Sequence, residues 1–142
     1  MTGTAANSLS EMFPARRAEL RRLGAFLETF CAARGIARER CLRLNLVLEE
    51  LFVNTIQHGL RGDSDAPVWV TLDASGPRLR ICYEDTAPPF NPYARLPTKG
   101  ADDTLEMRSV GGLGVLLTRE LAATRDYAYL FGRNRIRMEL AR

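Results

Sequence analysis

The sequence predicts an α+β fold, a two-layer sandwich in which a mostly antiparallel sheet carries helices on one face. Segments with helical periodicity and segments rich in β-forming residues are grouped along the chain, whereas parallel α/β folds alternate them. The strand-like segments also come in pairs joined by short turns, as antiparallel neighbours do. With 142 residues, of which 46% are apolar and 26% charged, the chain is long enough to bury a core as one domain, 1–142.

The first part of the chain predicts one strand and two helices. Residues 7–13 are expected to form a short strand, and Pro14 suits the first turn of a helix. Apolar residues then recur at helical spacing, namely Leu20, Leu23, Leu27 and Phe30. Gly35 is expected to end this helix. A second helix is predicted over 38–58, where apolar residues surround most of the circumference, which indicates substantial burial.

Two hairpins are predicted after the helices. The segments 68–73 and 78–84 are rich in β-forming residues and lie on either side of a Gly-Pro turn. The segments 126–131 and 135–141 form the second pair, with the turn expected at 132–134.

A long connection separates the two hairpins. Residues 87–110 contain four prolines and little periodicity, which favours a functional loop or lid over a structureless linker. A helix is predicted over 114–123.

Charge and composition exclude several classes of function. The chain has 20 basic and 17 acidic residues, a net charge of +3, and its arginines do not cluster as they do in nucleic-acid-binding proteins, so no direct nucleic-acid binding is expected. No segment approaches the roughly 18 apolar residues of a membrane span. The first residues are too polar for a signal peptide, so we expect a cytoplasmic protein without membrane contact. Cys31, Cys41 and Cys82 lack metal-ligand spacing and are expected to pack in the core.

Polar residues on the second helix form the first candidate site. Arg43, Glu50, Asn54 and His58 fall on one line, and the last three are four residues apart. A carboxylate on a largely apolar helix is costly unless it is paired or used. The helix alone leaves two interpretations open: Glu50 forms an ion pair with Arg43, or Glu50 has a functional role.

Two further motifs follow the second helix. Asp85 comes at the end of a predicted strand, before a proline-rich segment, where it could form a turn or accept a hydrogen bond from an exocyclic amine such as that of adenine. Gly111–Gly114 opens a predicted helix, where glycines allow the backbone to approach a phosphate. The position that would carry the last glycine of a dinucleotide-binding fingerprint is Leu117, and no P-loop sequence is present.

Taken together, the three motifs resemble, in order and spacing, the N, G1 and G2 boxes of the GHKL (Bergerat-fold) ATPases. The matching sequences are Glu50-Leu51-Phe52-Val53-Asn54 with His58-Gly59, then Asp85-x-Ala87, then Gly112-Leu113-Gly114. The chain is most similar to the small RsbW-type serine protein kinases, the anti-sigma factors of bacterial partner-switching systems. The resemblance runs from about Phe13 to the C-terminus.

This resemblance implies roles for residues of the first two motifs. Glu50 would act as a general base or orient the attacking group, and Asn54 would hold Mg²⁺. His58 belongs to the same nucleotide-binding box. Asp85 would accept a hydrogen bond from the adenine amine, and Ala87, where the family commonly has glycine, would leave space for the base.

The resemblance also implies roles for residues further along the chain. Cofactor binding is expected from Gly112, Leu113 and Gly114 at the phosphates and from Lys99 and Arg108 of an ATP lid over about 93–110. Arg137 would stand where relatives often have a threonine near the adenine.

The implied function is that of a Mg-ATP-dependent serine/threonine protein kinase. Such a protein phosphorylates a STAS-domain anti-anti-sigma factor, binds a sigma factor as an anti-sigma factor, and forms a homodimer. The only histidine of the chain, His58, lies within the N box, so a phosphoaccepting histidine on a separate helix pair is not expected. The alternative is an ATP-sensing regulator that binds partners without appreciable kinase activity.

Overall fold

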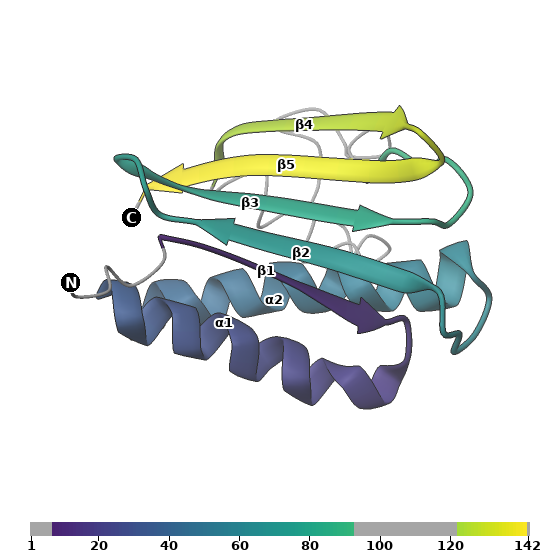
Figure 1. Ribbon diagram of the computed structural model, residues 1–142, viewed down its shortest axis with the longest axis horizontal. Coiled ribbons are helices and arrows are strands. Elements are labelled where there is room, and N and C mark those ends of the chain that lie inside the picture. Colours follow the sequence, from purple (N-terminus) through teal and green to yellow (C-terminus); the bar gives the residue numbers. More distant parts are fainter. Residues whose placement is uncertain (1–6, 93–121, 142) are drawn as a thin grey trace, which may run out of the picture.

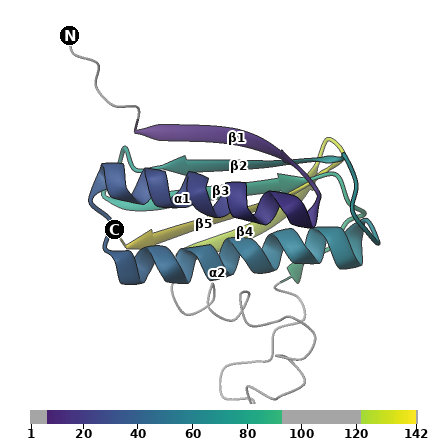
Figure 2. The same ribbon diagram turned by 90° about the horizontal axis from the view of Figure 1, so that it is seen from below.

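The computed structural model of the chain describes residues 7–92 and 122–141. They form a five-stranded antiparallel sheet with two α-helices packed on one face, while the other face is not covered by a helix of this part (Figure 1, Figure 2). The predicted α+β class is confirmed. The sheet order is β1-β2-β3-β5-β4, and the bounds are β1 Ser8–Pro14, β2 Pro67–Asp73, β3 Arg78–Asp85, β4 Ala122–Leu130 and β5 Arg133–Ala141.

Alternation of apolar and polar residues explains which face of the sheet meets the helices. Along β2, β3 and β5 every second residue is buried, because successive side chains of a strand point to opposite faces. The buried positions of these strands are Val68, Val70, Leu72, Leu79, Ile81, Tyr83, Asp85, Asn134, Ile136, Met138 and Leu140. Two polar residues, Asp85 and Asn134, therefore lie on the inner face, at the ends of otherwise apolar rows.

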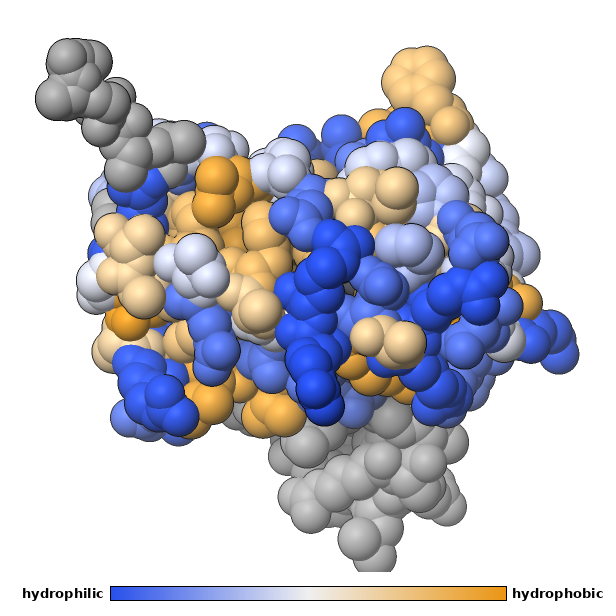
Figure 3. Space-filling model, turned by 60° about the horizontal axis from the view of Figure 1, so that its bottom comes forward, coloured by the Kyte–Doolittle hydropathy of each residue, from blue (hydrophilic) through white to orange (hydrophobic). Residues whose placement is uncertain are grey.

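The two helices cover this inner face. Helix α1 (Leu20–Arg34) ends at Gly35, whose φ of 67° is the left-handed conformation that glycine adopts at helix ends. Helix α2 (Arg38–Asn54) turns one face to the sheet, through Leu44, Val47, Leu48, Leu51 and Phe52. The expectation that α2 is buried around most of its circumference is wrong, because Leu42 and Leu46 are 50% and 44% exposed. Figure 3 shows apolar side chains among charged ones on the side of the molecule that comes forward in this view.

The predicted second helix continues beyond α2 in a different form. Residues Thr55–Gly59 form a π-helical turn, in which the Leu60 amide donates to the Thr55 carbonyl at 2.8 Å, five residues back. A π-turn widens the helix, and such turns are frequent at functional sites.

Two element boundaries differ from the prediction. Pro14 ends β1 and is not part of a helix, which an edge strand tolerates because the missing N–H is not needed there. Ala122 and Ala123 belong to β4 and not to a helix that ends at Ala123; the remainder of the predicted helix, 114–121, lies outside the described residues.

The second hairpin turns earlier than predicted. Leu130 pairs with Arg133, so the turn consists of Phe131 and Gly132, with φ of 52° and 76°. Two positive φ values are typical of a type I′ hairpin turn. The predicted turn at 132–134 is therefore wrong, and Asn134 is the second residue of β5.

The cysteine prediction is confirmed for two of the three residues. Cys31 and Cys41 are buried in the core, and burial raises the pKa of the Cys31 thiol to about 12. Cys82 is half-buried on the uncovered face, opposite Arg137. In the part of the chain that is described, no helix is long and apolar enough to cross a membrane.

Candidate functional site

A pocket opens where the end of α2, the π-helical turn, the end of β3 and the start of β5 meet. Its lining residues are Leu51, Asn54, Thr55, His58, Gly59, Tyr83, Asp85, Ala87, Pro88, Pro89, Phe90, Pro92, Asn134 and Ile136. Four sequence-predicted site residues, Asn54, His58, Asp85 and Ala87, are thus brought together in one pocket. Apolar and aromatic side chains form most of the wall, as is usual in sites for small molecules.

Asp85 contributes a buried carboxylate to the pocket, with 7% of its surface exposed. Its Oδ1 accepts hydrogen bonds from the Asn134 Nδ2 at 2.9 Å and from the Ala87 amide at 3.1 Å. Its Oδ2 accepts one from the Thr55 hydroxyl at 2.7 Å. A carboxylate has about four acceptor positions, so Oδ2 keeps the capacity to accept one more donor. The hydrogen bond from the Ala87 amide is the turn-forming contact that was predicted as one of two roles for Asp85.

Two buried hydroxyl groups support Asp85 from the helix side. The Tyr83 hydroxyl lies 2.6 Å from Thr55 Oγ1 and 3.1 Å from the Leu51 carbonyl. Burial raises the pKa of Tyr83 well above its ordinary value, so the phenol keeps its proton and acts as a donor. The Thr55 hydroxyl accepts from Tyr83 and donates to Asp85, and this chain orients the carboxylate.

Asn134 fixes the segment that follows β3. Its Nδ2 lies 2.9 Å from the Ala87 carbonyl and 3.1 Å from that of Pro88, in addition to its bond to Asp85. Its Oδ1 accepts from the Phe90 amide at 2.9 Å and from the Tyr127 hydroxyl. One buried amide thus holds both the carboxylate and the loop that forms the opposite wall.

Gly59 and Ala87 bring the two sides of the pocket into close contact. A Cβ built on Gly59 would lie 2.6 Å from the Ala87 Cβ, a distance that carbon atoms do not adopt without movement. Glycine is required here by space, and the small side chain at position 87 is part of the same fit.

The N-box residues lie at the helix side of the pocket. Asn54 lines it, and the Asn54 side chain makes no hydrogen bond to other described residues, so its amide oxygen is available to a ligand. An amide oxygen is a ligand of the kind that Mg²⁺ accepts together with water and phosphate oxygens. His58 also lines the pocket but is exposed.

Glu50 lies one turn before Asn54 and is not among the lining residues of the described part. Partial burial, and secondarily the neighbouring Glu49, raise the pKa of Glu50. The alternative ion pair with Arg43 is wrong, because Arg43 pairs with Glu39 at 3.2 Å.

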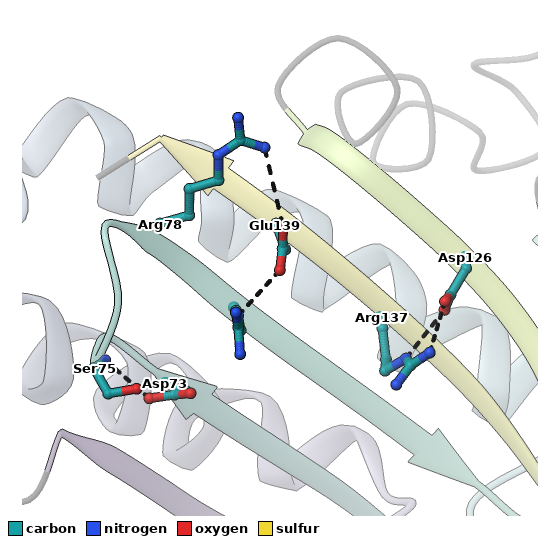
Figure 4. Close-up of polar contacts among 7 residues, drawn as sticks. Asp73, Ser75, Arg78, Asp126, Arg137 and Glu139 are labelled. Carbon is teal, nitrogen blue, oxygen red and sulfur yellow. Dashed lines mark hydrogen bonds and ion pairs between the residues drawn. The ribbon is translucent and has the colours of Figure 1, made fainter.

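Arg137 does not take part in the site. It lies on the uncovered face of β5 and forms an ion pair with Asp126 of β4 at 2.8 Å (Figure 4). Alternation along the strand explains the error. Odd-numbered residues of β5 point away from the helices, whereas even-numbered ones point towards them, and of these Asn134 and Ile136 line the pocket. The residue of β5 that lies beside Asp85 is Asn134.

Some expected site residues lie outside the described part of the chain. They are Lys99, Arg108, Gly112, Leu113 and Gly114, with the lid at 93–110.

Three polar residues of the site, Thr55, Tyr83 and Asn134, were missed in the sequence. For Asn134 a signal exists: it continues the row of Ile136, Met138 and Leu140 at a spacing of two, but asparagine close to glycine favours a turn. Nothing in the sequence alone indicates that Thr55 contacts Asp85, since the two residues are 30 apart.

The pocket therefore combines apolar walls with a buried carboxylate that can accept one more hydrogen bond, an arrangement suited to an aromatic ring that bears an amine. Comparison with protein families gives a match over residues 13–140 to the family described as Histidine kinase-like ATPase domain. A search of the curated proteins finds no match.

Proposed function

The chain belongs to the histidine kinase-like ATPase domain family, which supports ATP binding, and on this premise we propose that it is a Mg-ATP-dependent serine/threonine protein kinase of a bacterial partner-switching system. Its substrate would be a STAS-domain anti-anti-sigma factor, and it would bind a sigma factor as an anti-sigma factor. A cytoplasmic homodimer belongs to the same proposal.

One observation carries the nucleotide part of the proposal. A single pocket contains a buried, well-oriented acceptor, Asp85, and an amide oxygen without a protein partner among the described residues, Asn54. The first suits the exocyclic amine of adenine, which donates two hydrogens. The second suits a cation bound to phosphates. A ligand with an adenine ring at one end and a metal-bound phosphate chain at the other satisfies both.

Different residues of this chain would have different roles in phosphoryl transfer. Asp85, held by Thr55 and Asn134, orients the base, and Asn54 would hold Mg²⁺, which neutralises phosphate charge when bound. Glu50 would accept the proton of the acceptor hydroxyl. The acceptor oxygen then forms its bond to the γ-phosphorus, the bond to the β–γ bridging oxygen breaks, and ADP leaves. The raised pKa of Glu50 makes it a stronger base than an exposed glutamate.

A second candidate is an ATP-sensing regulator that binds partners without transferring phosphate. The observation that favours it is the position of Glu50, which is outside the pocket lining in the described part of the chain. Nucleotide would then change partner affinity without consumption of ATP.

Phosphate transfer separates the two candidates. The protein is incubated with γ-labelled ATP and Mg²⁺ in an extract of its source cells, beside Glu50→Gln, Asn54→Ala and the matched control Asn45→Ala. We expect a small protein labelled on serine or threonine by the wild type and by Asn45→Ala only. If an extract that contains a bound STAS-domain protein yields no label, and partner binding differs between ATP and ADP, the regulator is correct and the kinase is wrong.

A further inference from the structure

The tip of the second hairpin carries an unusual apolar surface. Phe131 is fully exposed, and its neighbours Tyr129 and Leu130 are 44% and 41% exposed. We call these three residues the hairpin tip. Leu130 is on the uncovered face of the sheet and Tyr129 on the helix face, so apolar surface is present on both sides of the tip.

The conformation of Phe131 is unfavourable for its own residue type. Its φ of 52° lies in the left-handed region, which asparagine and glycine tolerate and which is costly for a large side chain. The first central position of a type I′ turn strongly prefers asparagine or aspartate. Phe131 therefore adds nothing to packing within the described part and destabilises the turn, which points to a role outside the fold.

The hairpin tip lies close to the mouth of the pocket. Phe90 lines the pocket and is itself 42% exposed, and its amide donates to Asn134 Oδ1 at 2.9 Å. Asn134 is the cross-strand partner of Tyr129 and lies only three residues after Phe131. Asn134, which holds Phe90 at the pocket, is thus only about 10 Å along the chain from Phe131 at the tip.

Two arginines, Arg133 and Arg135, lie on β5 next to the hairpin tip. The Arg133 guanidinium lies 3.6 Å from the centroid of the Trp69 ring and forms an ion pair with Glu84 at 3.6 Å, on the face of the sheet away from the helices. Arg135 Nε is shielded from solvent and has no hydrogen-bond partner among the described residues. Aromatic residues and arginine are the types that dominate binding energy in protein–protein interfaces.

From this surface we propose that the hairpin tip is the docking site of a partner protein, whose apolar socket receives Phe131. One part of this inference rests on the proposed function, namely that the partner is the protein that receives the phosphate. A projecting ring fits a concave protein surface, and because the tip lies close to Phe90, a protein bound there would also lie at the pocket mouth. A lipid surface would not need to bind beside the pocket.

The test uses a variant that improves the turn and removes the ring, Phe131→Asn. Asparagine accepts a positive φ, so the midpoint of chemical denaturation is expected to be unchanged or higher. Binding of a non-hydrolysable ATP analogue is expected to be unchanged. The matched control is Leu42→Ala, since Leu42 is 50% exposed on α2, near the end of that helix away from the pocket. A fall in the stability of Phe131→Asn would show that Phe131 serves the fold, and would overturn the proposal.

The partner is identified and measured in two steps. A photoreactive phenylalanine analogue is placed at position 131, or at position 42 as a control, and irradiated in an extract of source cells. We expect one protein adduct from the probe at position 131. An excess of unlabelled wild type or of Leu42→Ala should suppress this adduct by competing for the partner, whereas an excess of Phe131→Asn should not. The captured protein, once purified, is expected to bind Phe131→Asn at least 10-fold more weakly than wild type.

The other outcomes decide the matter as well. No protein adduct, a lipid adduct, an adduct to a second copy of this chain, or equal competition by Phe131→Asn would overturn the docking site. A captured protein that depends on Phe131 but receives no label would keep the docking site and refute the kinase. Equal labelling of the acceptor by wild type and Phe131→Asn would keep the kinase and refute the docking site.

Discussion

Asn134 and Asp85 are 49 residues apart in the sequence, yet the Asn134 side-chain amide donates a hydrogen bond of 2.9 Å to Asp85 Oδ1. The two residues are direct cross-strand partners of β5 and β3. Because Asn134 also bonds the backbone of Ala87 and Phe90, the orientation of the carboxylate and the shape of the facing wall depend on one side chain.

Replacement of this side chain should affect stability and ligand binding together. Asn134→Ala removes one of the two donors to Asp85 Oδ1 and one of the two acceptors of the Phe90 amide. It also leaves the Ala87 carbonyl without the Nδ2 donor. Since an unsatisfied buried group costs about 1–3 kcal/mol, we expect a loss of this size in the free energy of unfolding and at least a tenfold loss in affinity for a non-hydrolysable ATP analogue. Chemical denaturation and calorimetric titration measure the two effects.

Asn45→Ala is the matched control for this experiment. Asn45 is half-buried, whereas Asn134 is buried; the Asn45 amide bonds Glu49 on α2 and lies outside the pocket lining. The affinity of the Asn45→Ala variant for the ATP analogue should equal that of the wild type. Unchanged affinity in Asn134→Ala would contradict the positioning role of Asn134.

The hydroxyls of Thr55 and Tyr83 should contribute unequally to binding. Thr55→Val keeps the shape but removes the donor to Asp85 Oδ2, whereas Tyr83→Phe leaves the Thr55–Asp85 bond in place. We expect Thr55→Val to weaken binding of the ATP analogue by tenfold or more. Tyr83→Phe should cost about 1 kcal/mol of stability with little change in affinity. The reverse order of affinities would rule out the proposed hydrogen-bond chain.

The effects of substitutions at Gly59 and Ala87 on stability should be coupled. Gly59→Ala places a Cβ at 2.6 Å from that of Ala87, and such overpacking costs about 1–3 kcal/mol. Ala87→Gly removes the opposing atom, so the double variant should regain most of the lost stability and analogue affinity. A double-mutant cycle measures the coupling free energy, which should exceed about 1 kcal/mol. Additive losses would mean that the two residues do not limit each other.

Glu50→Gln should change the pH dependence of the free energy of unfolding. Burial raises the pKa of Glu50 from the value of 4.5 expected without it, so the folded state favours the protonated form. At a pH above the raised pKa the folded protein bears the cost of a charged Glu50, and Gln removes this cost. The variant should therefore be more stable than wild type at pH 8, and the difference should disappear as the pH falls below the unfolded value.

Denaturation midpoints measured between pH 4 and pH 8 check this prediction. The control is Glu39→Gln, because the Glu39 side chain is 81% exposed and its removal should change stability little at any pH in this range. A Glu50→Gln variant that is less stable than wild type at pH 8 would show that the Glu50 charge is satisfied in the folded protein.

Several parts of the fold could be predicted because they depend on local pattern. The alternation along β2 and β3, the helical spacing from Leu20 to Phe30 and the helix-ending Gly35 all act within a few residues. The prediction failed where an isolated preference met a tertiary constraint. Asparagine after Gly132-Arg133 favours a turn, but pairing of Leu130 with Arg133 closes the hairpin earlier.

The sequence by itself determined the order of the described helices and strands and the motifs that contain Asn54 and Asp85. Only the tertiary structure decided that Asn134 and not Arg137 lies beside Asp85, because a strand's register selects which face each residue occupies and a shift of one residue reverses it. The contact of Gly59 with Ala87 and the support of Asp85 by Thr55 likewise depend on how α2 lies on the sheet. Such packing joins residues far apart in the chain, and no local pattern encodes it.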